Sequence, residues 1–64
     1  MRLDKYLKVS RIIKRRTIAN SLCDSGKVSV NGVVKKAQYE VNVGDKISIR
    51  YGEKEINHNV EKIP

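Results

Sequence analysis

The chain is poor in the residues that most often staple a small fold. Cys23 is its only cysteine, so no internal disulfide can form, and His58 is its only histidine. One Cys and one His fall short of the four ligands of a protein-only structural zinc site, and no cofactor motif is present. There is also no phosphate-cradling glycine loop and no pair of convergent catalytic groups, which argues against an enzyme. We therefore expect a single domain over residues 1–64, held by aliphatic packing.

Long hydrophobic runs are absent as well. The longest apolar runs are two residues, for example Ile12-Ile13 and Val33-Val34. Such runs are too short for the core of a signal peptide or for a membrane span. A lone cysteine fits a reducing compartment, so we expect a cytoplasmic protein that does not contact membranes.

Acidic residues are scarce in one half of the chain. Residues 1–36 carry ten Lys and Arg but only two Asp, a net charge of +8. Residues 37–64 carry four basic and five acidic side chains, a net charge of −1. This asymmetry predicts one surface that faces a polyanion and one that is structural. A face that served solubility alone would mix charges of both signs.

Aromatic residues are few, with no Phe, no Trp and three Tyr. Proteins that bind unpaired strands depend on aromatic side chains on which bases stack. A nucleic-acid ligand of this chain is therefore predicted to be structured and to be recognised through its backbone and shape. We expect burial for Tyr6 and Tyr51, a core position for Cys23 and an ordinary surface position for His58.

Two short helices are predicted in the basic half. The first covers residues 2–9, and its apolar face consists of Leu3, Tyr6 and Leu7, at helical spacing. Thr17 is predicted to be the N-cap of the second helix, because its hydroxyl can accept a hydrogen bond from a free backbone N–H. Gly26 is predicted to end that helix in the left-handed conformation. Both helices are too short to persist without packing.

Alternating hydrophobic and polar residues replace the helical period in the second half. Residues 27–30 and 33–35 are predicted strands, and Asn31-Gly32 between them is a strong signal for a type I′ hairpin. Residues 46–50 and 55–60 are predicted as two further strands. The expected fold is α+β, with two short N-terminal helices packed on a small, mostly antiparallel sheet of three to five strands.

Several short motifs follow one another at characteristic spacing. They are Arg2-Leu3-Asp4-Lys5-Tyr6-Leu7, Ser10-Arg11, Arg15-Arg16-Thr17, Gly26-Lys27-Val28-Ser29-Val30-Asn31-Gly32, Val41 and Gly44-Asp45. Together they resemble the S4 RNA-binding domain, also called the alpha-L motif, and the resemblance runs from Arg2 to about Tyr51. Residues 7–17 are most similar to the short stand-alone bacterial members of ribosome-associated quality control, which are related to a heat-shock group.

The resemblance implies a partner as well as a fold. Members of this kind bind the large ribosomal subunit and contact ribosomal RNA and the tRNA of a stalled peptidyl complex. We expect the same partners here, bound by a monomer. A role in ribosome biogenesis or in heat-shock recycling remains an alternative.

The residues expected to contact RNA lie on the first helix, on a basic connector over residues 10–16, at the start of the second helix and on the hairpin. They are Arg2, Asp4, Lys5, Lys8, Arg11, Lys14, Arg15, Arg16, Thr17, Asn20, Lys27, Asn31, Lys35 and Lys36. A guanidinium group can grip two phosphate oxygens at once. The hydroxyl of Thr17 and the side-chain amide of Asn20 add neutral donors. The free N–H groups at the start of the second helix also favour a phosphate.

Two of these residues have more than one interpretation. Asp4 can favour the helix dipole or pair with Lys8 one turn later. The family resemblance implies instead that its carboxylate orients a neighbouring arginine, such as Arg16, toward RNA. Asn31 is chiefly a turn residue that can also touch RNA.

Other classes of function are less well supported. S4 domains are often attached to RNA-modifying enzymes, so an accessory domain is an alternative, although the Met1 start favours a stand-alone protein. A binder of anionic membranes would need more apolar bulk than the first helix carries. Binding to DNA stays open, because phosphate contacts alone carry no preference.

Overall fold

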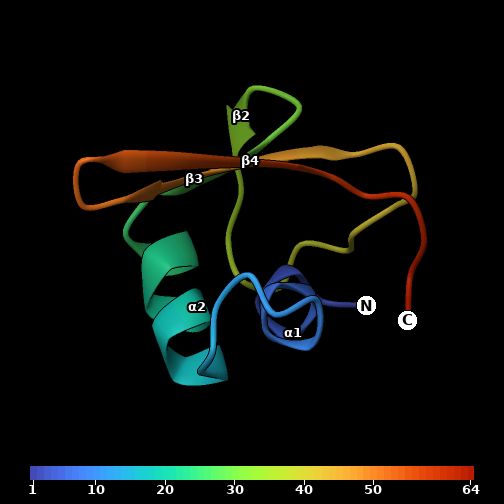
Figure 1. Ribbon diagram of the computed structural model, residues 1–64, viewed down its shortest axis with the longest axis horizontal. Coiled ribbons are helices and arrows are strands. Elements are labelled where there is room, and N and C mark those ends of the chain that lie inside the picture. The colour runs from blue at the N-terminus through green and yellow to red at the C-terminus, as the bar shows by residue number, and fades with distance from the viewer.

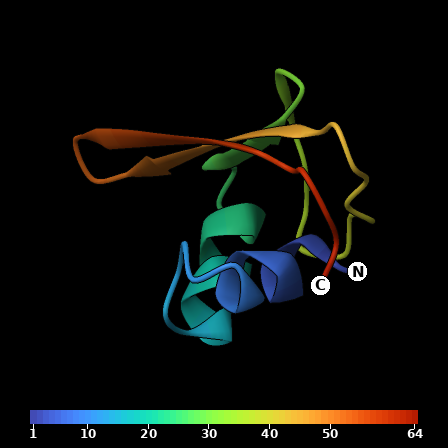
Figure 2. The same cartoon turned by 45° about the vertical axis from the view of Figure 1, so that its right-hand side comes forward.

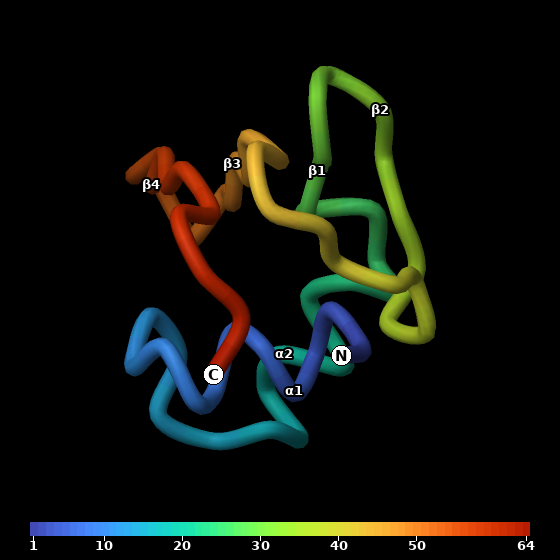
Figure 3. The backbone as a smooth tube through the Cα atoms, turned by 90° about the vertical axis from the view of Figure 1, so that its right-hand side faces the viewer, coloured from blue at the N-terminus to red at the C-terminus, as the bar shows by residue number.

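The computed structural model describes residues 1–64 and arranges them in two layers, helices on one side and a sheet on the other (Figure 1, Figure 3). The elements in chain order are α1 (Leu3–Val9), α2 (Arg16–Asp24), β1 (Val28–Val30), β2 (Val33–Val34), β3 (Lys46–Tyr51) and β4 (Lys54–Asn59). The strands lie in the order β2-β1-β3-β4, and every neighbouring pair is antiparallel. The predicted α+β fold is confirmed. Neither helix has the length and apolar character needed to cross a membrane.

The core lies between the two layers. The helices contribute Leu3, Tyr6, Leu7, Ala19 and Cys23, the sheet contributes Val28, Val30, Ile47 and Ile49, and the connecting segments contribute Ile13, Ala37, Val41 and Val60. Cys23 is fully buried as predicted, and burial, followed by the nearby charges of Asp4 and Asp24, raises the pKa of its thiol to about 11. Such a thiol is inert at neutral pH.

The second helix begins earlier than predicted. Arg15, in an extended conformation, is its N-cap, no side chain caps it, and Arg16 is its first residue. The amide of Ala19 donates to the carbonyl of Arg15 (3.1 Å), which starts the helical hydrogen bonds before Thr17. The prediction of Thr17 as N-cap was therefore wrong, because contacts of Arg16 with α1 outweigh the local preference for a threonine cap.

The turns follow the predicted chemistry. Asn31 and Gly32 both have positive φ, 54° and 83°, as a type I′ turn requires, and they join β1 to β2. Gly26 has φ 79° just after α2 and supports the predicted helix stop. The last strand is Lys54–Asn59 rather than residues 55–60, because Tyr51 pairs directly with Lys54 across a tight hairpin.

Tyr51 is 46% exposed, so the prediction of its burial was wrong, whereas Tyr6 is buried as expected. Tyr51 continues the inner face of β3, two residues after Ile49. The β3–β4 hairpin, however, projects beyond the helical layer (Figure 2), so Tyr51 lies past the end of the core and stays about half exposed. His58 also departs from its predicted role, because its Nε2 atom forms a hydrogen bond of 2.7 Å with the hydroxyl of the buried Tyr6.

Candidate nucleic-acid interface

The predicted RNA-binding surface is organised around the carboxylate of Asp4, which is only 2% exposed. Arg2 donates from Nε to Oδ1 (3.2 Å) and Arg16 donates from Nε to Oδ2 (3.3 Å). The side-chain amide of Asn20 donates to Oδ2 (3.2 Å), and the backbone amide of Lys5 donates to Oδ1 (2.8 Å). Both helices and Arg2, the N-cap residue of α1, therefore meet at one buried carboxylate.

Burial acts to raise the pKa of Asp4, but the surrounding donors outweigh it. Hydrogen bonds from Asn20, Arg16 and the Lys5 amide, with the charge of Arg16, hold the pKa below its ordinary value of 3.8. The carboxylate is thus ionised at neutral pH, and it fixes one edge of each guanidinium group. The side chains of Arg2 and Arg16 remain 49% and 46% exposed, so their other edges stay available to an anion.

The contacts of Asp4 bear on its interpretations. Its ion pairs are with Arg2 and Arg16, and no ion pair with Lys8 is present. Asp4 does lie in the first turn of α1, but its carboxylate is directed to the two arginines. The carboxylate thus binds two arginines from a position that is also favourable to the helix dipole, and it does not pair with Lys8. Thr17, Ser21 and Asn20 join Asp4 and Arg16 around an open depression of about 450 Å³.

The connector between the helices presents further cations. Arg11 has φ 65°, a left-handed conformation that costs a non-glycine residue roughly 1–2 kcal/mol. The conformation is held by the buried side chain of Ile13, whose amide donates to the carbonyl of Leu7 (3.0 Å). As a result Lys8 and Lys14 line one open depression together with Arg11.

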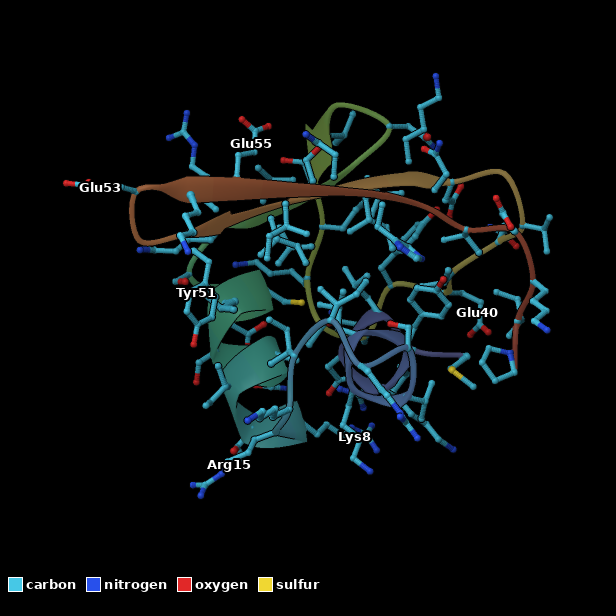
Figure 4. The ribbon with its side chains drawn as sticks, viewed as in Figure 1. Lys8, Arg15, Glu40, Tyr51, Glu53 and Glu55 are labelled. Atoms are coloured by element: carbon cyan, nitrogen blue, oxygen red, sulfur yellow. The ribbon has the colours of Figure 1, made fainter.

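Figure 4 shows that the labelled basic and acidic side chains lie on different parts of the molecule. Lys8 and Arg15 project from the helical layer on the side away from the sheet. Glu53 and Glu55 lie at the β3–β4 hairpin, on the opposite side of the molecule. The predicted residues of α1, the connector and the start of α2 thus lie together on the helical layer. Glu53 and Glu55 are separated from them by the width of the molecule.

The hairpin residues are a separate group. Asn31, whose side chain donates to Asp45 Oδ1 (3.1 Å) and accepts from the amide of Lys46 (3.0 Å), is bound within the turn. Lys35 lies over the ring of Tyr39, 5.1 Å from its centroid. Lys36 donates to the carbonyl of Asp24 at the end of α2 (3.2 Å), and Lys27 is exposed just before β1. The turn itself extends from the sheet away from the helices (Figure 1), so Asn31 is not brought together with the arginines.

Asp45 is a residue that the sequence pattern marks only as part of a turn. Its buried carboxylate accepts from Asn31, from the hydroxyl of Tyr39 (2.9 Å) and from the amide of Asn42 (2.9 Å). The Asn42 amide lowers the pKa of Asp45 most, burial opposes it, and Tyr39, Asn31 and the charge of Lys35 lower it further. Asn42 and Tyr39 lie only 3 and 6 residues before Asp45, whereas Asn31 lies 14 residues before it and reaches the carboxylate through the tertiary fold.

Acidification is expected to destabilise the fold through Asp4 and Asp45. Both carboxyl groups have a pKa below the value of about 3.9 that an unfolded Asp has, so each stabilises the folded state above that pH. Protonation removes this contribution as pH falls below about 4 and through the folded values. Melting temperatures measured between about pH 6 and about pH 2.5 should fall as the pH is lowered. In Asp45→Asn the melting temperature should fall less steeply with pH. An equally steep decline in Asp45→Asn would contradict the role of that carboxylate.

Comparison with known proteins gives a consistent picture. The model of the S4 domain family matches residues 1–47. The chain is 56% identical over 54 residues to the RQC P-site tRNA stabilizing factor of Streptococcus pneumoniae, covering 84% of this chain and 61% of that protein. It is 48% identical over 63 residues to the protein of the same name from Bacillus subtilis, covering 98% of this chain and 73% of that protein.

A solved structure is similar over the whole chain. The trimeric structure of Vibrio cholerae Heat Shock Protein 15 matches with a TM-score of 0.92 and 38% identity, over 100% of this chain and 65% of that one. The chain thus spans about two thirds of the proteins it matches. The matched family segment contains both helices, the connector and the hairpin, which are the elements that carry the predicted site.

Proposed function

The chain belongs to the S4 domain family, and from this we propose that it binds structured RNA, namely ribosomal RNA and tRNA on the large ribosomal subunit, in the quality control of stalled translation. The observation that carries the proposal is the buried Asp4 carboxylate, which holds two half-exposed guanidinium groups side by side. The names of the relatives from Streptococcus pneumoniae and Bacillus subtilis support the tRNA as a ligand.

The mechanism of binding follows from the arrangement of donors. Arg2 and Arg16, each fixed by one edge, offer the other edge to phosphate oxygens without having to be ordered on binding. Thr17 and Asn20 lie around the same depression as neutral donors, at the start of α2, where free N–H groups favour an anion. Lys5, Lys8, Arg11, Lys14 and Arg15 extend the positive field along α1 and the connector. Lys27, Lys35 and Lys36 provide a second contact.

In this proposal the protein acts by binding alone, as a single-domain cytoplasmic monomer without a catalytic step, a metal or a cofactor. The exposed side chains of α1 and the connector are mainly basic donors, and the one thiol is buried with a raised pKa. The solved structure of Heat Shock Protein 15 is trimeric, so light scattering coupled to size-exclusion chromatography is the measurement that decides the oligomeric state. The same structural match makes heat-shock recycling the second candidate function.

Co-sedimentation with large ribosomal subunits tests the proposal. Arg2→Ala and Arg16→Ala should each reduce the bound fraction, with a loss of affinity of about tenfold, because each removes a charge-assisted phosphate contact worth about 1.5–3 kcal/mol. Arg11→Gly should also reduce binding, while relief of the left-handed strain keeps its melting temperature at or above that of the wild type.

Arg50→Ala is the matched control. It removes an exposed cation from the outer face of the sheet, opposite to the helical layer, and should leave co-sedimentation unchanged. Unaltered binding of both Arg2→Ala and Arg16→Ala would overturn the assigned site. Equal losses in all four variants would show that binding depends on net charge and not on the Asp4 cluster.

A further inference from the structure

A third concave site lies beside the basic connector, and its lining is mainly hydrophobic. It is an open pocket of about 350 Å³ lined by Ile12, Ile13, Lys14, Arg15, Ile18, Tyr51 and Ile56. Five of its seven lining residues are hydrophobic. It therefore contrasts with the polar depression around Asp4, which no hydrophobic residue lines.

The pocket arises because the β3–β4 hairpin is longer than the helical layer beneath it. Ile49 and Ile56 pair across the two strands, and Tyr51 continues their face past the end of the core. In Figure 4 Tyr51 hangs from the hairpin beside α2. Ile18, on the adjoining surface of α2, is 38% exposed. An aromatic ring and aliphatic side chains thus face an open space that no part of the chain fills.

Such a cluster is unusual on a chain with so few apolar residues to bury. Single exposed hydrophobic side chains need no explanation, but a concave group of them marks a binding site. Tyr51 is also the most exposed of the three tyrosines, since Tyr6 is buried and Tyr39 is partly buried with Lys35 over its ring, so Tyr51 is the ring best placed to offer a face to a ligand.

The rim of the pocket indicates the kind of ligand. Lys14 and Arg15 belong both to this pocket and to the basic connector of the proposed interface. Glu53 projects outward from the tip of the hairpin, and Glu55 lies on the side of the strands opposite to Tyr51 (Figure 4). An apolar slot with one aromatic ring and two cations at its edge suits a planar base whose neighbouring phosphates carry negative charge.

We propose that this pocket, between the connector, α2 and the β3–β4 hairpin, accepts a single unpaired base of the bound RNA, stacked on Tyr51. The inference rests on the proposed function and extends it: the arginines hold the backbone of structured RNA, and the pocket selects RNAs that have an extruded base close to it. One ring accommodates one base, so this site adds a structural preference to a surface that otherwise recognises shape and charge. A protein partner is the competing occupant, but the two cations at the rim favour RNA.

Two RNA hairpins with identical stems test the proposal, one fully paired and one with a single bulged 2-aminopurine. The wild type should bind the bulged hairpin about tenfold more tightly than the paired one. Stacking of one base on an aromatic side chain contributes about 1–3 kcal/mol to binding, and tenfold lies near the lower end of that range. The fluorescence of the 2-aminopurine should fall on binding as the base stacks on the ring. Tyr51→Ala should lose both effects and bind the paired hairpin as the wild type does, whereas Tyr51→Phe should retain both.

Ile18→Lys separates the pocket from general electrostatics. The added cation should keep or increase affinity for the paired hairpin, while the longer polar side chain occupies the pocket and removes the preference for the bulge. Melting temperatures of all variants verify folding, and because Ile18 and Tyr51 are both partly exposed, the substitutions leave the core intact.

The outcomes are distinguishable. Equal affinity of the wild type for the two hairpins, or a preference that survives in Tyr51→Ala, overturns the base pocket and leaves the proposed function standing. Failure of the wild type to bind either hairpin or ribosomal subunits overturns both. If the bulge has no effect while Tyr51→Ala abolishes co-sedimentation with ribosomal subunits, the pocket belongs to a protein partner and the proposal is wrong.

Discussion

Raising the salt concentration from about 50 to about 200 mM should weaken RNA binding by this chain roughly 250- to 1,000-fold. Each phosphate neutralised by a Lys or Arg releases condensed counterions, so the logarithm of affinity falls linearly with the logarithm of salt concentration. About six contacts from Arg2, Arg16, and the cations of α1 and the connector give an expected slope near −4 to −5. Filter binding or fluorescence anisotropy over a salt series measures that slope directly.

Single substitutions give this prediction its internal control. Arg16→Ala should reduce the magnitude of the slope by about one, since it removes one phosphate contact. Arg50→Ala should leave the slope unchanged, because Arg50 lies on the outer face of the sheet, outside the basic surface. A slope near zero in the wild type would contradict phosphate binding as the source of affinity, whatever the effect of the single variants.

Asp4→Asn should both destabilise the fold and weaken RNA binding. The asparagine amide keeps the volume but loses the charge, and its NH₂ group faces the donors of Arg2, Arg16 or Asn20 instead of accepting from them. Breaking a buried ion pair by removal of one partner costs about 3–5 kcal/mol, and the half-exposed guanidinium groups reduce the expected loss to about 2–3 kcal/mol. For a small domain this corresponds to a fall in melting temperature of roughly 10–20 °C.

The binding part of this prediction is measured at a temperature where the variant is folded. Without the carboxylate the two guanidinium groups lose their fixed orientation, so the affinity for RNA should fall although the net positive charge rises by one. Asp24→Asn is the matched control, because it makes the same change of charge at an exposed residue at the end of α2. A variant Asp4→Asn that melts and binds like Asp24→Asn would show that the carboxylate organises nothing.

The elements of this fold were accessible to prediction wherever the signal was local. The spacing of Leu3, Tyr6 and Leu7 indicates α1, and Asn31-Gly32 indicates the first hairpin, because only residues that tolerate positive φ fit its turn. The charge asymmetry between the two halves indicated a cationic surface. The first two signals lie within a few residues of the feature that each predicts, and the third needs only the order of charges along the chain.

The errors share a different origin. The N-cap of α2, the exposure of Tyr51 and the hydrogen bond between His58 and Tyr6 all depend on where one element ends relative to another. A threonine before an apolar stripe is a good local cap, and a tyrosine at the end of an alternating strand is usually covered. The first rule does not contain the contact of Arg16 with Asp4 on α1, and the second does not contain the end of the helical layer short of the β3–β4 hairpin.

The sequence by itself determined that the protein has no disulfide, that its charge is concentrated in the first half, and that two helices precede a small antiparallel sheet. These follow from inventory, net charge and short-range periodicity. Only the tertiary structure decided that Asp4 holds Arg2, Arg16 and Asn20 at once, that the hairpin turn stands apart from them, and that Tyr51 overhangs an open pocket. A buried carboxylate selects its partners by proximity in three dimensions, and its donors here come from positions up to 16 residues away, beyond the reach of any local pattern.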